Sequence, residues 1–107
     1  MYIVLFRSRL TDEAGSDYED MAGEMLELAK SQPGFIDFTQ YTGADGERLS
    51  VVRWKDKETL EAWRNNERHR VAQSKGREQW YASYHIEIAE LVRERRFDKA
   101  EPSTPRR

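Results

Sequence analysis

PGFIDFTQYTGADGERLSVVRW, residues 33–54, predicts two antiparallel strands joined by a tight turn. The runs on both sides of the turn are rich in β-branched and aromatic residues, and Asp45-Gly46 is a pair typical of short hairpins. Alternation along the first strand places Ile36, Phe38 and Gln40 on one face of the sheet. The opposite face receives Phe35, Asp37, Thr39 and Tyr41.

Upstream of the hairpin, the sequence predicts a strand followed by a helix. The run YIVLFRSR, residues 2–9, is rich in β-branched and aromatic residues and apolar in its first part. Between positions 18 and 29, apolar residues recur at i, i+3, i+4 and i+7 spacing, which predicts an amphipathic helix with one buried stripe. Pro33 and Gly34 end this helix, because proline cannot continue the hydrogen-bond ladder and glycine suits a turn.

Downstream of the hairpin, a second helix and a last strand are expected. Asp56 is a candidate cap for a helix that continues to Gly76. Asn65 and Asn66 are poor helix formers, so they predict either a kink in this helix or a break into two pieces. The segment WYASYHIEIAELV, residues 80–92, predicts the last strand.

The resulting order is β-α-β-β-α-β, which is typical of the ferredoxin-like α+β fold. Two helices should cover one face of a four-stranded antiparallel sheet. The strand at residues 2–9 is apolar on both faces, as strands covered on both sides are. We therefore expect the second face to meet another copy of the chain, which gives a homodimer with a barrel-like core.

Composition bounds the functions that the chain can have. Its 107 residues suit one domain, predicted at residues 1–95, and the charged, proline-containing residues 96–107 predict a disordered tail. A net charge of −2 gives no reason to expect binding to nucleic acid or to an anionic membrane. The absence of cysteine excludes disulfides and thiolate chemistry. The two histidines form neither an HxH nor an HxxxH pair, so the sequence does not indicate a metal site. The apolar N-terminal run is too short for a signal or membrane segment, so we expect a cytoplasmic protein.

Three segments, PGFIDFTQYTG, SVVRWKDKETLEAW and HRVAQSKGREQWYASYHIEIAEL, resemble the antibiotic biosynthesis monooxygenase family of dimeric α+β barrels. The likeness extends over residues 2–91 in the expected order. Its most specific parts are Pro-Gly-Phe after the first helix, Trp54 at the end of a strand, and Trp63 followed by His69, Gly76-Arg77 and Trp80-Tyr81.

This resemblance implies an oxygenase that needs no cofactor and acts on a phenolic or quinone-like aromatic compound. In such enzymes a dry pocket binds a phenol and helps to deprotonate it, and O₂ reacts with the resulting carbanion. The resemblance implies that Trp63 shapes the pocket and His69 accepts the proton. Arg77 or Tyr81 would orient the substrate, and Ser8 is a further candidate for substrate contact.

Two other functions remain open at this point. The haem-degrading branch of the family uses a histidine and an asparagine where this chain has Gln73 and Ser8. His69 lies one helical turn earlier and would displace the iron by about 6 Å at roughly 1.5 Å rise per residue. A third possibility is a ligand-binding or stress-response module of the same fold without catalysis.

Each histidine also has a purely structural interpretation. On an unbroken helix His69 would lie roughly 120° from Trp63, at about 100° per residue, and would leave the apolar stripe. A break at the two asparagines could return it to that side. His85, between Tyr84 and Ile86 on the last strand, is expected to be a buried or interface histidine rather than a base.

Overall fold

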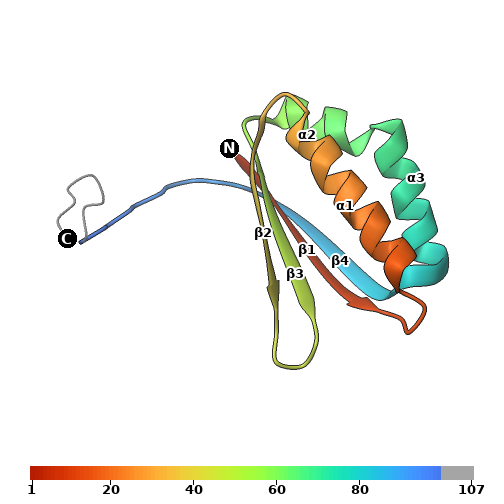
Figure 1. Ribbon diagram of the computed structural model, residues 1–107. Coiled ribbons are helices and arrows are strands. Elements are labelled where there is room, and N and C mark those ends of the chain that lie inside the picture. The colour runs from red at the N-terminus through yellow and green to blue at the C-terminus, as the bar shows by residue number, and fades with distance from the viewer. Residues whose placement is uncertain (100–107) are drawn as a thin grey trace.

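The structure, a computed structural model, describes residues 1–99 apart from the side chains of Glu67 and Arg68. One face of a four-stranded sheet is covered by three helices, and the other face is left open (Figure 1). The elements in chain order are β1 (Tyr2–Leu10), α1 (Ser16–Lys30), β2 (Phe35–Thr42), β3 (Arg48–Trp54), α2 (Lys57–Arg64), α3 (Glu67–Lys75), the π-helical turn η1 (Gly76–Trp80) and β4 (Tyr81–Glu90).

The strand order in the sheet is β2-β3-β1-β4, and every neighbouring pair is antiparallel, so the ferredoxin-like fold is confirmed. Ser8 of β1 lies opposite both Arg48 of β3 and Tyr84 of β4. The register therefore places the even-numbered side chains of these three strands together on the face beneath the helices. The odd-numbered side chains point to the open face, except at the start of β4, where an irregularity between Arg9 and Leu10 places Tyr81 on the cavity face.

A bulge at the start of β2 changes the alternation expected from the sequence. Phe35 pairs with Trp54 and Asp37 pairs with Arg53, so Ile36 is an extra residue without a partner of its own. Phe35 therefore lies on the helix face with Phe38, and Ile36 is 42% exposed. The sequence predicted that Ile36 shares a face with Phe38 and that Phe35 lies on the opposite face. Because of the bulge, both predictions were wrong.

The second predicted helix is broken into α2 and α3, which confirms one of the two alternatives for the asparagine pair. α2 ends at Arg64, and α3 begins at Glu67. Asn66 caps the new helix, since its side-chain Oδ1 accepts a hydrogen bond from the backbone N–H of His69 at 3.2 Å. The break is thus stabilised by the residue that causes it.

The buried core lies between the sheet and the ends of α1 and α2. Ala29, Trp54 and Leu60 form its centre, and partly buried side chains including Phe35 and Trp63 pack around them. Trp54 is completely buried, and its indole N–H has no hydrogen-bond partner in the described part of the chain. The chain enters β2 through Gly34, whose φ of 85° suits glycine and whose Cα lies against Thr59 of α2.

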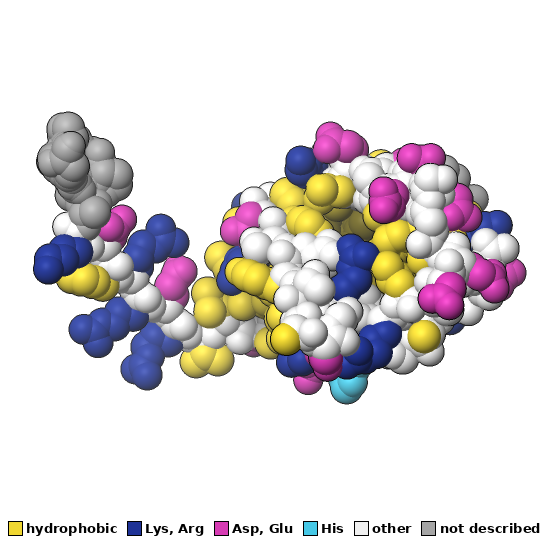
Figure 2. Space-filling view, turned by 60° about the horizontal axis from the view of Figure 1, so that its bottom comes forward, with side chains coloured by type: hydrophobic (Ala, Val, Ile, Leu, Met, Phe, Trp, Pro, Cys, Tyr) yellow, Lys and Arg dark blue, Asp and Glu magenta, His cyan; other side chains and the backbone are white. Residues whose placement is uncertain are grey.

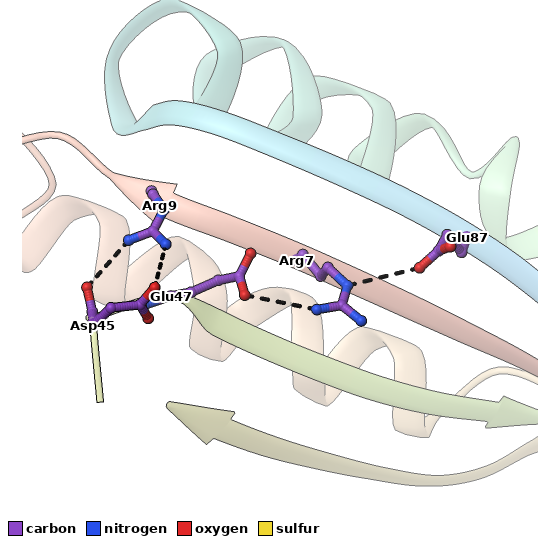
Figure 3. Close-up of polar contacts among 5 residues, drawn as sticks. All are labelled: Arg7, Arg9, Asp45, Glu47 and Glu87. Atoms are coloured by element: carbon purple, nitrogen blue, oxygen red, sulfur yellow. Dashed lines mark hydrogen bonds and ion pairs between the residues drawn. The ribbon is translucent and has the colours of Figure 1, made fainter. Parts of the chain in front are cut away.

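The open face of the sheet is charged at the end where the β2–β3 hairpin turns (Figure 3). Arg7 lies between two carboxylates, with 3.6 Å from its Nη1 to Glu47 and 3.7 Å from its Nε to Glu87. Arg9 binds Asp45 at 2.7 Å, and this hydrogen bond holds the pKa of the Asp45 carboxyl below its usual value. These pairs are exposed, so each adds little to stability.

Beyond β4, residues 91–99 have no regular secondary structure and extend away from the sheet (Figure 1). The predicted domain of residues 1–95 and the predicted tail of residues 96–107 remain predictions. Residues 100–107 of that tail lie outside the described residues. None of the described helices is long and apolar enough to cross a membrane.

Candidate functional site

A cavity of about 430 Å³ lies between the sheet and the helices. Figure 2 shows a hollow with hydrophobic side chains on its walls and basic side chains nearby. A cavity of this volume suits one small organic molecule. Its walls are mostly apolar, with Val4 and Phe6 from β1, Met21 and Met25 from α1, and Ile86 from β4.

At the α2–α3 end of the cavity, three aromatic rings form a continuous stack. Trp54 and Trp63 have ring centroids 5.9 Å apart with an interplanar angle of 26°. Trp63 and His69 are closer, at 4.3 Å and 18°. His69 reaches this position because α3 begins anew at Glu67, and both Trp63 and His69 line the cavity. The structure therefore brings together the two residues that the sequence proposed as catalytic.

The imidazole of His69 has a defined protonation pattern. Its Nδ1 lies 3.2 Å from the backbone carbonyl oxygen of Trp63. A carbonyl oxygen can only accept a hydrogen bond, so Nδ1 carries the proton of the neutral ring and Nε2 carries the lone pair. Burial lowers the pKa of His69 below its ordinary value of 6.5, and the bond to Trp63 opposes this only in part. At pH 7 the side chain is a neutral base.

The other end of the cavity is a cluster of phenol rings. Tyr81 makes edge-to-face contacts with Phe6 at 5.5 Å, Tyr18 at 6.1 Å and Tyr84 at 5.7 Å. Burial raises the pKa of Tyr81, and its hydrogen bond with Tyr18 adds to this shift. Tyr81 is therefore a neutral hydroxyl that can donate a hydrogen bond. Tyr81 and Tyr84 both line the cavity.

The absence of a side chain at Gly76 leaves room for the Tyr81 ring. A Cβ at Gly76 would lie 2.5 Å from Cε2 of Tyr81, closer than two carbon atoms can pack. Gly76 opens the π-helical turn η1, and such turns are frequent at functional sites. At the far end of η1, Trp80 donates a hydrogen bond from Nε1 to Asp17 of α1 at 3.3 Å. Both contacts hold the phenol cluster against the helices.

Ser8 and Arg48 lie beside this cluster on the floor of the cavity. Ser8 is 5% exposed and lines the cavity, as its predicted contact with a substrate requires. Arg48, directly opposite Ser8 in β3, places its guanidinium carbon 5.5 Å from the centre of the Tyr18 ring. When the side-chain amide of Gln40 is oriented with its oxygen towards Arg48, that oxygen accepts hydrogen bonds from Nε of Arg48 at 2.8 Å and from Nη2.

Two residues singled out from the sequence lie elsewhere. Arg77 is exposed on η1 and does not line the cavity, so this cavity gives it no direct contact with a substrate. His85 is exposed on the open face of the sheet, opposite Arg7 of β1. Among the side chains that the structure describes, no three histidines, aspartates or glutamates form a group that could hold a metal ion.

Arg48 is the functional candidate that sequence reasoning missed. The signal was present in RLSVVRW, where alternation puts Arg48 and Ser50 on the same face as Val52 and Trp54. A cation on the same face of a central strand as core residues is unusual, because charged side chains are rarely buried under a helical layer unless they have a partner.

Comparison with known proteins gives a consistent result. Residues 1–75 match the family model described as antibiotic biosynthesis monooxygenase. The uncharacterized protein YqjZ of Bacillus subtilis is 35% identical over 98 residues, which cover 92% of this chain and 85% of YqjZ. The jasmonate monooxygenase ABM of Pyricularia oryzae is 28% identical over 94 residues, covering 86% of this chain and 44% of that protein.

Among solved structures, SnoaB from Streptomyces nogalater, described as a cofactor-independent oxygenase, has a TM-score of 0.72. The match covers 87% of this chain and 94% of the SnoaB chain at 13% identity, so it shows a shared fold.

Proposed function

This chain belongs to the antibiotic biosynthesis monooxygenase family, and on that premise we propose that it oxidises a small phenolic or quinone-like aromatic compound with O₂, without a cofactor. The observation that carries the proposal is the neutral His69 imidazole, stacked on Trp63 in the wall of an apolar cavity. It places a base, held in position by an aromatic ring, in the wall of a mostly apolar cavity.

In the proposed reaction, Nε2 of His69 takes the proton of the substrate hydroxyl, and the electron-rich ring carbon forms a bond to O₂. The imidazolium returns its proton to the resulting carbon–peroxide, which becomes a hydroperoxide. The neutral imidazole then takes the ring C–H proton while the O–O bond breaks, and it passes this proton to the departing hydroxide, which leaves as water. A phenol and O₂ thus give a quinone and one water, and the substrate supplies all the electrons. The stacking of the imidazole on Trp63 fixes the position of the base in the cavity wall.

The pKa of His69 restricts which phenols can react. An ordinary phenol has a pKa of about 10, roughly 3.5 above that of a free imidazole, so proton transfer even to a free imidazole would cost about 5 kcal/mol. Burial lowers the pKa of His69 and increases this cost. Compounds whose anion is delocalised over several rings or a neighbouring carbonyl are more acidic and reduce this cost. We therefore expect polycyclic hydroxy-aromatic compounds to react and simple phenols to be poor substrates.

The comparisons support this proposal at the level of reaction type. A curated relative is named a monooxygenase, and SnoaB, which shares the fold, is described as a cofactor-independent oxygenase. The two positions where the haem-degrading branch carries its asparagine and histidine hold Ser8 and Gln73, which counts against the haem alternative and leaves His69 as its ligand candidate.

We also propose that the active protein is a homodimer that covers the open face of the sheet. The odd-numbered positions of β1 and β3 put Ile3, Leu5 and Val51 on that face. An apolar strip on an uncovered sheet face favours a second copy as its cover. Size-exclusion chromatography with light scattering should give twice the mass of one chain, and a monomer would contradict this part of the proposal.

Oxygen uptake tests the reaction directly. Chelator-treated protein, without added flavin or metal, should consume O₂ with a panel of dihydroxynaphthalenes and anthrones. His69→Gln should lower kcat by about 100-fold or more, the usual contribution of a positioned base. Arg77→Gln is the control, because it changes an exposed side chain outside the cavity and should leave uptake unchanged.

Two results would decide against the proposal. If no compound in the panel supports uptake, the ligand-binding module without catalysis becomes the better interpretation. If added hemin gives a Soret shift that disappears in His69→Ala, the haem alternative replaces it.

A further inference from the structure

Arg48 is a cation in the wall of a mostly apolar cavity, and its partners among the side chains that the structure describes are neutral. Tyr18 presents its ring to the guanidinium, and Gln40 presents an amide oxygen. The ion pairs formed by the described residues use Arg7, Arg9, Arg53 and Arg64, and Arg48 takes part in none of them. Its positive charge is therefore held in place without being neutralised.

The contact with Gln40 also fixes which edge of the guanidinium is available. Gln40 accepts from Nε and Nη2, so it occupies one edge of the planar group. The edge formed by Nη1 and Nη2 is left for another acceptor. Two parallel N–H donors on one edge match the two oxygens of a carboxylate, which is the preferred geometry of arginine–carboxylate pairs.

Further hydroxyl groups surround this position. Ser8 lies directly opposite Arg48 in the sheet, and Tyr84 lies directly opposite Ser8 on its other side, all on the cavity face. Tyr81 is close enough for the charge of Arg48 to act on its phenol. These groups supply hydrogen bonds to an acceptor without adding any negative charge that would repel an anion.

The cation and the base lie at opposite ends of the cavity floor. Arg48 lies six positions along β3 from Trp54, the first ring of the stack that ends in His69. This corresponds to about 20 Å of strand at roughly 3.3 Å per residue. Between them the walls are apolar. A molecule held at both ends would therefore have a polar group at each end of an apolar body.

We propose that Arg48 binds a carboxylate group of the substrate, so that the compound oxidised in this cavity is an aromatic acid. Only the oxidation of the bound acid rests on the proposed function, since carboxylate binding at Arg48 is independent of the reaction. The apolar body of the acid fills the middle of the cavity, and the carboxylate pairs with the free edge of Arg48. The site thereby orients the substrate along the cavity.

Binding of 2-naphthoate and of its neutral isostere 2-naphthamide at pH 8, measured by isothermal titration calorimetry, tests this inference. Neither compound has a hydroxyl group, so neither can enter the proposed reaction. Hydrogen bonds to a charged group contribute about 1.5–3 kcal/mol, so the wild-type protein should bind the carboxylate about 10- to 100-fold more tightly than the amide.

Arg48→Gln should abolish this preference while it leaves the affinity for 2-naphthamide unchanged, which also shows that the cavity is intact. Arg48→Lys should retain part of the preference. If the glutamine variant does not fold, a reduced preference in the lysine variant tests the inference instead. Arg77→Gln, which removes an exposed arginine outside the cavity, should behave as the wild type.

Equal affinity of the wild type for both compounds would overturn the inference, and so would a preference that persists in Arg48→Gln. Oxygen uptake separates this result from the reaction. A carboxylate preference without uptake supports the anion site and removes the proposed function. Uptake with neutral phenols in a protein that has no carboxylate preference leaves the function in place and removes the anion site.

Discussion

Replacing Asn66 by alanine should loosen the helix that carries His69. Asn66 is the N-cap of α3, and its side chain accepts the backbone N–H of His69 at 3.2 Å. Alanine keeps the backbone but cannot accept that hydrogen bond. The first turn of α3 should then fray, and the imidazole should move away from the Trp63 ring.

The magnitude follows from the cap and from the length of the helix. Loss of an asparagine cap costs about 1 kcal/mol, within a range of about 0.5–2 kcal/mol. α3 has only nine residues, and isolated helices shorter than about 12–15 residues are marginal, so its first turn depends on the cap and on the contacts of His69 with Trp63. A loss of about 1 kcal/mol should lower Tm by about 4–8 °C in a domain of this size.

Thermal unfolding gives the stability, and NMR gives the position of the ring. In the wild type the imidazole Cε1 proton should be shifted upfield by the stacked Trp63 ring, and in Asn66→Ala it should move towards its random-coil position. Asn66→Ser is the matched control, since serine retains a side-chain acceptor and should restore most of the stability and the shift. The reasoning is refuted if Asn66→Ala unfolds at the wild-type temperature, or if the serine variant is as unstable as the alanine variant.

The remaining predictions concern one titration and two glycines. The activity should be flat near neutral pH and fall as pH drops below 6.5 through the lowered pKa of His69, measured as kcat/KM against pH, and His69→Gln should lack this acid limb. The same shift should make unfolding by urea easier in that window, because the unfolded chain takes up the proton first. Gly76→Ala should cost about 1–3 kcal/mol by overpacking against Tyr81, and should weaken ligand binding in calorimetry. Gly34→Ala should cost at least about 1–2 kcal/mol of unfolding free energy in urea, since φ is positive there and the new methyl group would overlap Thr59.

Different results would count against each of these predictions. An acid limb that survives in His69→Gln would show that another group controls the activity. Stability that stays constant between neutral pH and pH 5 would contradict the lowered pKa. Wild-type stability in Gly76→Ala or Gly34→Ala would show that Tyr81 or Thr59 can move away at little cost.

Most of the fold was predictable because its signals are local. The hairpin at Asp45-Gly46, the amphipathic pattern of α1 and the order of strands and helices all depend on residues that are close in sequence. The break between α2 and α3 was indicated by Asn65 and Asn66, but only as one of two alternatives. Helix propensity cannot tell a kink from a new start, because that depends on whether the asparagine side chain finds an N–H to cap.

The candidate site was predictable only in part. Trp63 and His69 were proposed together, yet their stacking depends on a change of helix direction that a helical wheel cannot represent. Arg77 was proposed because Gly76-Arg77 is one of the most specific parts of the family resemblance, whereas Arg48 was not considered. Phe35 was predicted on the wrong face of the sheet, because a bulge depends on how two strands pair and one strand's sequence does not determine that pairing.

The register of the sheet has a consequence for how this chain can diverge. Because the cavity face of β1, β3 and β4 uses every second residue, deletion of a single residue within one of these strands would exchange its cavity side chains for those of the open face. Such a deletion in β1 would exchange Ser8 and its apolar neighbours for side chains of the open face, and one in β3 would do the same for Arg48 or for Val52 and Trp54. Insertions and deletions that preserve the pocket are therefore confined to the loops and to the bulge at Ile36, where β2 already accommodates one residue out of step. The lengths of the strands in related chains should vary less than their sequences.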